Sequence, residues 1–489
     1  MRTRFPPSPT GFLHVGSLRT ALYCYLLAKQ TKDKFFLRIE DTDQQRSVPG
    51  AIENIVKTLH WAGLDPDEGV MFKNGVIVQE GSRGPYIQSE RLPLYKKYAQ
   101  ELLEKGHAYP CFCTTERLDQ MRKAQEARKV PPMYDRTCLK LSKEEVDRRV
   151  AAGEPHVIRL KIPHERTISF DDDIRGVVTF KAMLIDDQVL LKSDGYPTYH
   201  LAHVVDDHLM ETDLVLRGEE WLSSLPKHIL LFEFFGWTAP RYAHVPLLLN
   251  QDKTKLSKRQ GDVAVEEYIA KGYLPEALLN FLALLGWNPG TTQEIFSLAE
   301  LIDAFNLERV QKAGAIFDLE KLHWLQGQWM RKIPKQEFAE RCRAFVSEKF
   351  HAAKSDPDFE RKALLIQERI TFFSEAPEML GFFYEEPSPK LDLLANSKQK
   401  VAKDDVKPIL ALLITTLQPI KSIEWSDDTL KDSIEQSIAK GSFKRGQLLW
   451  VLRAALTGRE FSPGAYEVAT VLGKDETVKR LHNASRLIA

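Results

Sequence analysis

The stretch of sequence that decides the fold lies near the amino terminus and reads Pro7-Ser8-Pro9-Thr10-Gly11-Phe12-Leu13-His14-Val15-Gly16-Ser17. Residues 2–6 before it can form a short strand, and apolar residues at helical spacing follow Ser17, which we expect to cap that helix. The prolines and Gly11 stiffen and then turn the chain, so that His14 and Gly16 fall at the helix entry. A helix entry offers unpaired backbone N–H groups and a positive dipole end. The stretch therefore predicts a strand–turn–helix cradle for a phosphorylated ligand.

Further strand and helix patterns extend this unit in both directions along the chain. An amphipathic helix is predicted at residues 51–59, and apolar strands are predicted at residues 35–39, 213–217 and 242–250. Strand–helix–strand units of this kind build parallel sheets. The sequence therefore predicts a Rossmann-like α/β domain with a parallel sheet.

The length of 489 residues is too great for one core, so we predict a multidomain protein. Strand patterns nearly vanish after Glu320, and a polar stretch near residues 385–408 is expected to separate two helical subdomains. The predicted parts are a Rossmann-like domain split between 1–75 and 190–250, an inserted α+β domain at 76–189, a loop and helical domain at 251–330, and an all-α region at 331–489.

Composition narrows the class of protein. Lys+Arg and Asp+Glu both number 68, so net charge alone gives no sign of a polyanionic partner, although the surface distribution of charge can still provide for one. A hydrophobic share of 43% argues against general disorder. No run of 18 apolar residues predicts a membrane span, and the first motif begins too early to follow a signal peptide. Five cysteines fit a reducing compartment, so a cytoplasmic location is expected.

A second short string, Lys255-Leu256-Ser257-Lys258-Arg259, follows an apolar strand and a polar turn. A mobile loop that carries two lysines can close on a phosphate leaving group and act mainly in the transition state. A basic pentapeptide alone is more often a solvated loop. Because this one follows the first motif on an α/β background, we interpret it as catalytic, with Mg²⁺ arriving on ATP.

The two strings resemble the two signatures of class I aminoacyl-tRNA synthetases. Residues 4–22, RFPPSPTGFLHVGSLRTAL, resemble the opening of bacterial and organellar glutamyl-tRNA synthetases, and Ser17 replaces the second histidine of the general signature. The resemblance continues in residues 36–43, 195–202, 204–208 and 217–221 and covers nearly the whole chain, most weakly after residue 330. It implies ATP-dependent ligation of L-glutamate to tRNA(Glu) through glutamyl-adenylate, with activation awaiting bound tRNA. It also implies a monomer, an acceptor-end-binding insertion and an anticodon-binding helical region.

A pocket for glutamate needs fixed cations for the carboxylates of the substrate. Arg4 on the first strand and Arg217 at the end of another can each donate paired hydrogen bonds, and Glu40 can hold the ammonium group. Because ligands bind beyond the carboxyl ends of parallel strands, Glu40 and Arg217 are expected in one crevice. The resemblance implies glutamate contacts to Arg4, Ser8, Glu40, Tyr199, His203 and Arg217, although many family members have Asn where this chain has His203.

The resemblance also implies an ATP site with a catalytic subset. The implied ATP contacts are Thr10, His14, Gly16, Glu220, Lys255, Ser257 and Lys258. Among these, the expected catalytic residues are His14, Lys255 and Lys258.

Cys111, Cys113 and Cys138 gather within the predicted insertion and are one ligand short of a tetrahedral zinc site. Some relatives bind Zn²⁺ at this place. Tyr134, four residues before Cys138, is a possible fourth ligand, and His107 is a remoter candidate. The alternative is a zinc-free knuckle of three reduced thiols.

Other interpretations stay open beside the glutamate enzyme. A glutaminyl-type synthetase is disfavoured because an amide side chain needs no guanidinium partners. A catalytically dead tRNA-binding paralogue would lose His14 or Lys258, and both are present. A truncated tRNA-modifying relative or a small-molecule nucleotidylyltransferase would not need residues 320–489. The acidic run Asp206-Asp207-His208 is expected to be structural, not a metal site.

Overall fold

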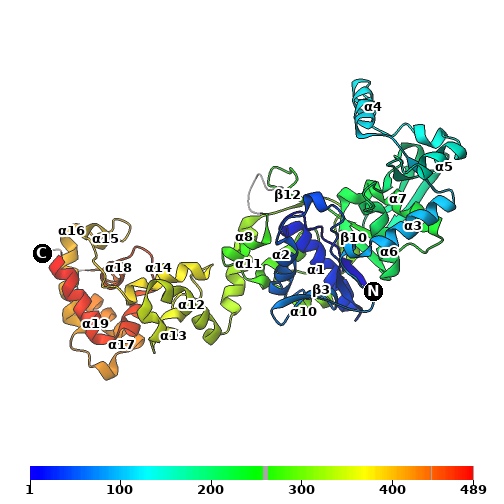
Figure 1. Cartoon of the computed structure of the whole chain (residues 1–489). Coiled ribbons are helices and arrows are strands. Elements are labelled where there is room, and N and C mark those ends of the chain that lie inside the picture. Colours follow the sequence, from blue (N-terminus) through cyan, green and yellow to red (C-terminus); the bar gives the residue numbers. More distant parts are fainter. Residues whose placement is uncertain (257–262, 442, 488–489) are drawn as a thin grey trace. The chain divides into compact units, whose positions relative to one another are not determined.

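The computed structural model describes residues 1–256, 263–441 and 443–487 (Figure 1). The chain forms two compact units, of which the first comprises Met1–Ala270 and Pro275–Leu322 and the second comprises Lys271–Leu274 and His323–Ala489. Helix α11 (Leu319–Lys332) contains the point where the chain passes from the first unit to the second. In the described part of the chain, no helix is long and apolar enough to cross a bilayer.

An eight-stranded sheet forms the centre of the first unit, in the order β4-β3-β2-β1-β10-β11-β7-β8. Its inner neighbours pair in parallel, whereas the edge strands β4 and β8 pair antiparallel to β3 and β7. The predicted α/β fold with a parallel sheet is therefore confirmed. The strands are β1 (Thr3–Phe5), β2 (Phe35–Leu37), β3 (Glu68–Lys73), β4 (Val76–Glu80), β7 (Thr167–Asp172), β8 (Gly176–Lys181), β10 (Leu214–Gly218) and β11 (Arg241–Val245).

The strand order reverses between β1 and β10. From β1 the chain adds β2 and β3 on one side, and β10 and β11 lie on the other. A crevice opens at the carboxyl ends of the strands at such a switch point. Arg4 on β1 and Arg217 on β10 therefore flank the place where this fold binds ligands.

Helices cover this sheet and connect its strands (Figure 1). Helix α1 contacts both β1 and β10, with Leu18, Leu22 and Leu26 fully buried. The helices of the first unit before α11 are α1 (Val15–Gln30), α2 (Ala51–Trp61), α3 (Leu92–Glu104), α4 (Thr115–Ala127), α5 (Lys143–Ala151), α6 (Tyr199–Leu209), α7 (Leu225–Phe235), α8 (Val265–Ala270), α9 (Pro275–Leu284) and α10 (Leu298–Ala304).

The start of α1 differs from the prediction. Ser17 is not the N-cap but the third residue of the helix, and His14 takes the cap position in an extended conformation. The Nδ1 atom of His14 accepts a hydrogen bond from the Gly16 backbone N–H at 2.9 Å. A Cβ atom on Gly16 would lie 3.2 Å from that Nδ1, so glycine leaves room for the capping ring. The prediction failed because an imidazole can cap a helix as a hydroxyl does.

A three-stranded antiparallel sheet is formed by β5 (Ala108–Cys111) and β6 (Val157–Leu160) of the predicted insertion and by β9 (Val189–Leu191) at its end. Strands β7 and β8 also fall within the predicted range 76–189, yet β7 pairs with β11 and extends the main sheet. A further parallel pair joins β12 (Leu248–Leu249) to β13 (Ala315–Ile316). The predicted domain bounds stay predictions.

The described residues of the second unit form helices, with an isolated bridge between Asn396 and Val401. The polar stretch at 385–408 is not wholly a linker, because α16 begins inside it and Leu394, Val401 and Val406 are buried in the core of the helices that follow. The helices are α12 (Lys335–Lys349), α13 (Phe359–Leu364), α14 (Ala376–Leu380), α15 (Leu391–Leu394), α16 (Lys403–Leu417), α17 (Asp427–Lys440), α18 (Arg445–Thr457) and α19 (Ala465–Leu487).

Candidate active site

A cavity of about 960 Å³ opens at the switch point of the main sheet. It collects most of the predicted site residues, namely Arg4, Ser8, Thr10, His14, Gly16, Glu40, Tyr199, Arg217, Glu220 and Lys255. His203 does not line this cavity, and Ser257 and Lys258 lie outside the described residues. These residues come from β1 and the loop after it, from the ends of β2 and β10, from the 3₁₀ helix that follows β10, from the starts of α1 and α6, and from the loop after β12.

The entry of α1 places the His14 ring and the positive end of the helix dipole at one end of the cavity. Because Nδ1 of His14 accepts from the Gly16 N–H, the neutral imidazole carries its proton on Nε2. The first four N–H groups of α1 all donate within the protein, so the helix entry adds the positive end of its dipole beside the ring. Lys255 is exposed at the rim of the same cavity. This end of the cavity is therefore suited to phosphate groups.

Buried ion pairs hold the floor of the cavity. Arg4 and Arg38 share the Asp207 carboxylate, at 3.0 Å from Arg4 Nε and 2.8 Å from Arg38 Nη1 to Oδ1. Arg38 Nη2 also lies 2.8 Å from Glu40 Oε1. Burial opposes the charged form of Asp207, but the guanidinium groups of Arg4 and Arg38 hold the pKa of this carboxyl well below its usual range. The ion pairs thus fix both Arg4 and Glu40.

The acidic run lies inside α6 and is structural, as expected. Asp206 accepts hydrogen bonds from Arg91 Nε, Gln88 Nε2 and Tyr95 Oη, each at 2.8 Å. Asp206 and Asp207 are both buried within the helix. A buried carboxylate with several donors is stable in its charged form, so the pair anchors α6 beneath the cavity.

Arg217 differs from Arg4 in its partners, although both guanidinium groups are buried. Its Nη1 donates to Tyr199 Oη at 2.8 Å, its Nε donates to His244 Nε2 at 3.0 Å, and its Nη2 lies 3.3 Å from His228 Nδ1. Among the described residues, no carboxylate is paired with this guanidinium. Arg217 therefore faces the cavity as a buried cation whose direct partners are all neutral.

His203 supports the cavity wall from behind. Its ring stacks on Tyr199, with centroids 5.2 Å apart, and its Nδ1 lies 2.8 Å from Asp207 Oδ2. Burial lowers the pKa of His203 to about 3, so the ring is neutral at ordinary pH. The structure thus places His203 beside Tyr199 and Asp207, and the predicted contact with glutamate stays a prediction.

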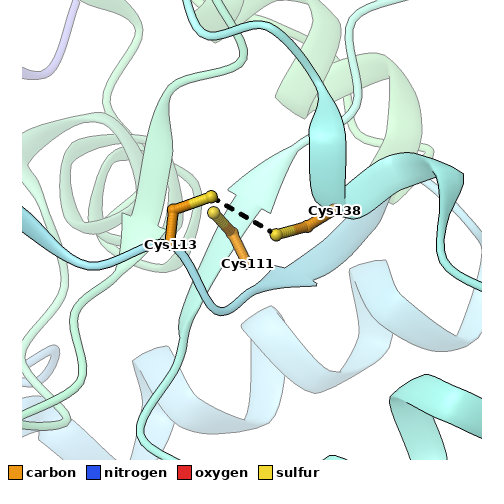
Figure 2. A group of neighbouring side chains, drawn as sticks. All are labelled: Cys111, Cys113 and Cys138. Carbon is orange, nitrogen blue, oxygen red and sulfur yellow. Dashed lines mark hydrogen bonds between the residues drawn. The ribbon is translucent and has the colours of Figure 1, made fainter. Parts of the chain in front are cut away.

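The three predicted cysteine ligands meet away from this cavity (Figure 2). The sulfur atoms of Cys111, Cys113 and Cys138 all lie within 4.8 Å of one another, and Tyr134 Oη lies 3.4 Å from the sulfurs of Cys111 and Cys113. Hydrogen bonding from the Cys138 thiol lowers the pKa of Cys111 to about 4. Three sulfur ligands at this spacing fit three corners of a tetrahedral zinc site. His107 instead stacks on Phe234.

Sequence reasoning missed the histidines that contact Arg217. His244 lies in register with Arg217 on the adjacent strand β11, and His228 lies on α7. Both side chains are fully buried. A histidine inside an otherwise apolar strand such as 242–250 was the available signal, but its partner could not be identified without the pairing of β10 with β11.

The cavity at the switch point of the parallel sheet is lined by a helix entry and by buried arginines. This arrangement defines an α/β nucleotide-binding protein with a pocket for an acidic ligand. Residues 1–324 match the family model of the catalytic domain of class I tRNA synthetases (E and Q), and residues 337–485 match that of an anticodon binding domain. The chain belongs to the class I tRNA synthetases of this glutamate and glutamine group.

Similar proteins cover the whole chain. A glutamate–tRNA ligase of Chlorobium luteolum is 44% identical over 505 residues, which cover 100% of this chain and 98% of that protein. A glutamate–tRNA ligase of Prosthecochloris aestuarii is 45% identical over 498 residues, which cover 98% of this chain and 97% of that protein. The crystal structure of a glutamate tRNA ligase from Elizabethkingia meningosepticum in complex with its amino acid matches with a TM-score of 0.89 at 36% identity, covering 100% of both chains.

Proposed function

We propose that this chain is a glutamate–tRNA ligase that activates L-glutamate with ATP and transfers the glutamyl group to tRNA(Glu). The observation that carries the proposal is Arg217, a buried cation whose direct partners are neutral. A substrate carboxylate would supply the missing negative charge, whereas a carboxamide would leave the guanidinium uncompensated. The full-length similarity to glutamate–tRNA ligases supports the same choice.

The chemistry is an in-line displacement followed by acyl transfer. An α-carboxylate oxygen of glutamate attacks the α-phosphorus of ATP, and pyrophosphate leaves as glutamyl-adenylate forms. A hydroxyl of the terminal ribose of tRNA then attacks the carbonyl carbon, and AMP leaves. Catalysis consists of positioning and charge stabilisation, with no covalent enzyme intermediate.

Each predicted residue has a role in this scheme. Thr10, His14, Gly16 and Glu220 bind the nucleotide, and Lys255, Ser257 and Lys258 act on its phosphates. Arg4, Ser8, Glu40, Tyr199 and Arg217 bind glutamate, with Glu40 facing its ammonium group. His203 contacts glutamate directly or positions Tyr199, on which its ring stacks. The line-up of most of these residues around one cavity supports the assignment.

Two metal ions are proposed for different purposes. Mg²⁺ binds with ATP through the phosphates and neutralises part of their charge. Cys111, Cys113, Cys138 and Tyr134 would hold Zn²⁺, which would stabilise this part of the chain. Such a site would be structural, because its residues do not line the cavity.

The proposed working form is a monomer in the cytoplasm, where charged tRNA is consumed. The five free thiols suit a reducing compartment. The inserted domain would hold the acceptor end of tRNA, and the helices of the second unit would read the anticodon, since residues 337–485 match an anticodon binding domain.

The test is charging of separate glutamate and glutamine tRNAs by the full-length protein, with labelled glutamate and, in parallel, with labelled glutamine. ATP-dependent attachment of glutamate to tRNA(Glu) is expected. Attachment of glutamine to tRNA(Gln), without glutamate on either tRNA, would favour a glutaminyl-type enzyme and overturn the proposal. Charging of tRNA(Gln) with glutamate would extend the tRNA range without changing the amino acid.

A further inference from the structure

We propose that His228 and His244 are positioning residues that grip the Arg217 guanidinium with neutral acceptors and so leave its charge for the substrate side chain. This inference rests on the proposed function and deepens it, because it explains how a glutamate pocket keeps a buried cation both fixed and uncompensated. Neither histidine lines the cavity, so both act through Arg217.

The first arm of the grip runs across neighbouring strands of the main sheet. Arg217 on β10 is in register with His244 on β11, and Asp172 ends β7 on the far side of β11. The Nε–H of Arg217 donates to His244 Nε2 at 3.0 Å. The proton of the neutral imidazole is therefore on Nδ1, which lies 2.5 Å from Asp172 Oδ2. Asp172 thus sets the tautomer that lets His244 accept from Arg217.

The first arm is itself held in place by the backbone. Asp172 Oδ1 accepts from the backbone N–H groups of Arg175 at 2.8 Å and of His244 at 3.2 Å. Asp172 and His244 are both buried. A buried carboxylate with donors of this kind has little freedom to move, so the orientation of the imidazole is fixed.

The second arm comes from α7 and α6. A guanidinium has no acceptor, so His228 Nδ1 accepts from Arg217 Nη2 across 3.3 Å. The His228 proton is then on Nε2 and is donated to His200 Nδ1 at 3.0 Å. Burial lowers the pKa of both His228 and His244, which keeps each ring neutral. Both arms therefore present a lone pair and no negative charge.

Neutral acceptors matter because a carboxylate would hold Arg217 equally well but would cancel its charge. Arg4 shows the alternative, since its Nε is paired with Asp207. At Arg217 the negative charge is missing from the direct contacts, and a glutamate side chain can supply it. The pair of histidines therefore acts on specificity: it favours a charged ligand over its neutral amide.

His228 offers a matched test of charge. His228→Gln keeps a neutral acceptor, and His228→Glu has nearly the same shape with one negative charge. We expect the KM for glutamate to be at least about 10-fold higher in His228→Glu than in His228→Gln, with the KM for ATP equal in the two. Inhibition by glutamine should not weaken in His228→Glu. Thermal unfolding of both variants gives the control for folding.

His244 offers a matched test of the acceptor. Gln can accept from Arg217 and donate to Asp172, whereas Leu can do neither. His244→Gln should remain within a few-fold of the native KM for glutamate, and His244→Leu should raise it by about 10-fold or more at an unchanged KM for ATP. This pair decides the proposal if His228→Glu does not fold.

The inference is overturned if the members of each pair behave alike, or if the KM values for glutamate and ATP rise together. A failure of the proposed function would give a different result. If the proposed function is wrong, the native, full-length protein itself does not attach glutamate to tRNA(Glu), whatever the variants do.

Discussion

Arg4 and Arg217 are chemically identical side chains in one cavity, yet their surroundings give them different electrostatic roles. Arg4 is paired with Asp207, and that carboxylate is shared with Arg38. Arg217 has a tyrosine hydroxyl and two imidazoles as its partners. A buried cation without a counter-ion is costly unless a ligand supplies one. Discrimination between glutamate and glutamine is therefore expected to depend on Arg217 more than on Arg4.

Replacement of Arg217 by Gln removes the cation but keeps a hydrogen-bonding side chain. We expect kcat/KM for glutamate to fall by about 10²–10³-fold, because a buried charged partner is lost. Glutamine should lose much less, since it has no side-chain charge to leave unpaired. Steady-state kinetics with both amino acids measure the difference.

The matched control is Arg166→Gln, which removes an exposed arginine paired with Glu233 on the surface. Its kinetics should remain within about 2-fold of native. Equal losses for glutamate and glutamine in Arg217→Gln would remove this residue from the specificity pocket.

At the scale of residues, the sequence predicted those side chains that stand inside extended motifs. Glu40 and Arg217 were expected in one crevice, and both line one cavity together with Arg4. His244 and Asp172 were not predicted, because their significance depends on the side-by-side order of β10, β11 and β7. A local pattern cannot show which strands become neighbours across a long stretch of chain.

At the scale of elements, the entry of α1 and the loop after β12 face one cavity from different parts of the sequence. The entry of α1 is fixed by the His14 cap, whose ring accepts from the Gly16 N–H. The loop after β12 carries Lys255 at the cavity rim and continues to Lys258, which lies outside the described residues. A fixed cradle with the Lys255 cation beside it suits a reaction in which pyrophosphate forms and then leaves.

Lys258→Ala is expected to slow adenylate formation by at least ~100-fold, while ATP binding weakens far less. The reason is that the charge acts on the pyrophosphate as it develops. Single-turnover adenylate formation in the presence of tRNA measures this step. Lys57→Ala removes an exposed lysine of α2 and provides the control. A native rate of adenylate formation in Lys258→Ala would exclude the role.

The cysteine cluster is expected to bind one equivalent of zinc in protein prepared without chelator. The metal should be lost in Cys111→Ser and Cys138→Ser, because each removes a thiolate ligand. Cys342→Ser, which alters a buried thiol of α12, should keep it. Elemental analysis checks all three variants. Absence of zinc from the native protein would contradict the metal site and would favour the alternative, a zinc-free knuckle of three reduced thiols.

The elements themselves were largely predictable, since burial imposes a period on helices and strands. Helix α2 covers the predicted 51–59, and β10 lies close to the predicted 213–217. The predicted N-cap of α1 was wrong because the capping group is an imidazole. The prediction of a linker at 385–408 was wrong in part, because a polar sequence can still contribute buried side chains such as Leu394 and Val406.

At the scale of the whole molecule, the chain forms two compact units. The first unit holds the cavity, and the second unit matches an anticodon binding domain over residues 337–485. Within the second unit, the core formed by α15 to α19 is nearly self-contained, with Phe382 as its main member from outside residues 386–489. A cut before this core should therefore leave the first unit folded.

Deletion of residues 386–489 is expected to leave the ATP and glutamate pockets folded while weakening tRNA binding. The truncated protein should also respond less to changes in the anticodon, and adenylate formation should fall if it depends on bound tRNA. Charging of tRNA with native and altered anticodons by both proteins measures this. A folded truncated enzyme that discriminates between anticodons like the full-length protein would refute the role of this region.

The most direct measurement of the central claim is the ratio of kcat/KM for glutamate to that for glutamine, with full-length protein, ATP and tRNA(Glu). A pocket with an uncompensated buried cation predicts a preference for glutamate of about 10⁴-fold or more. Comparable values for the two amino acids, or a preference for glutamine, would contradict the assignment of Arg217 and with it the proposed glutamate–tRNA ligase.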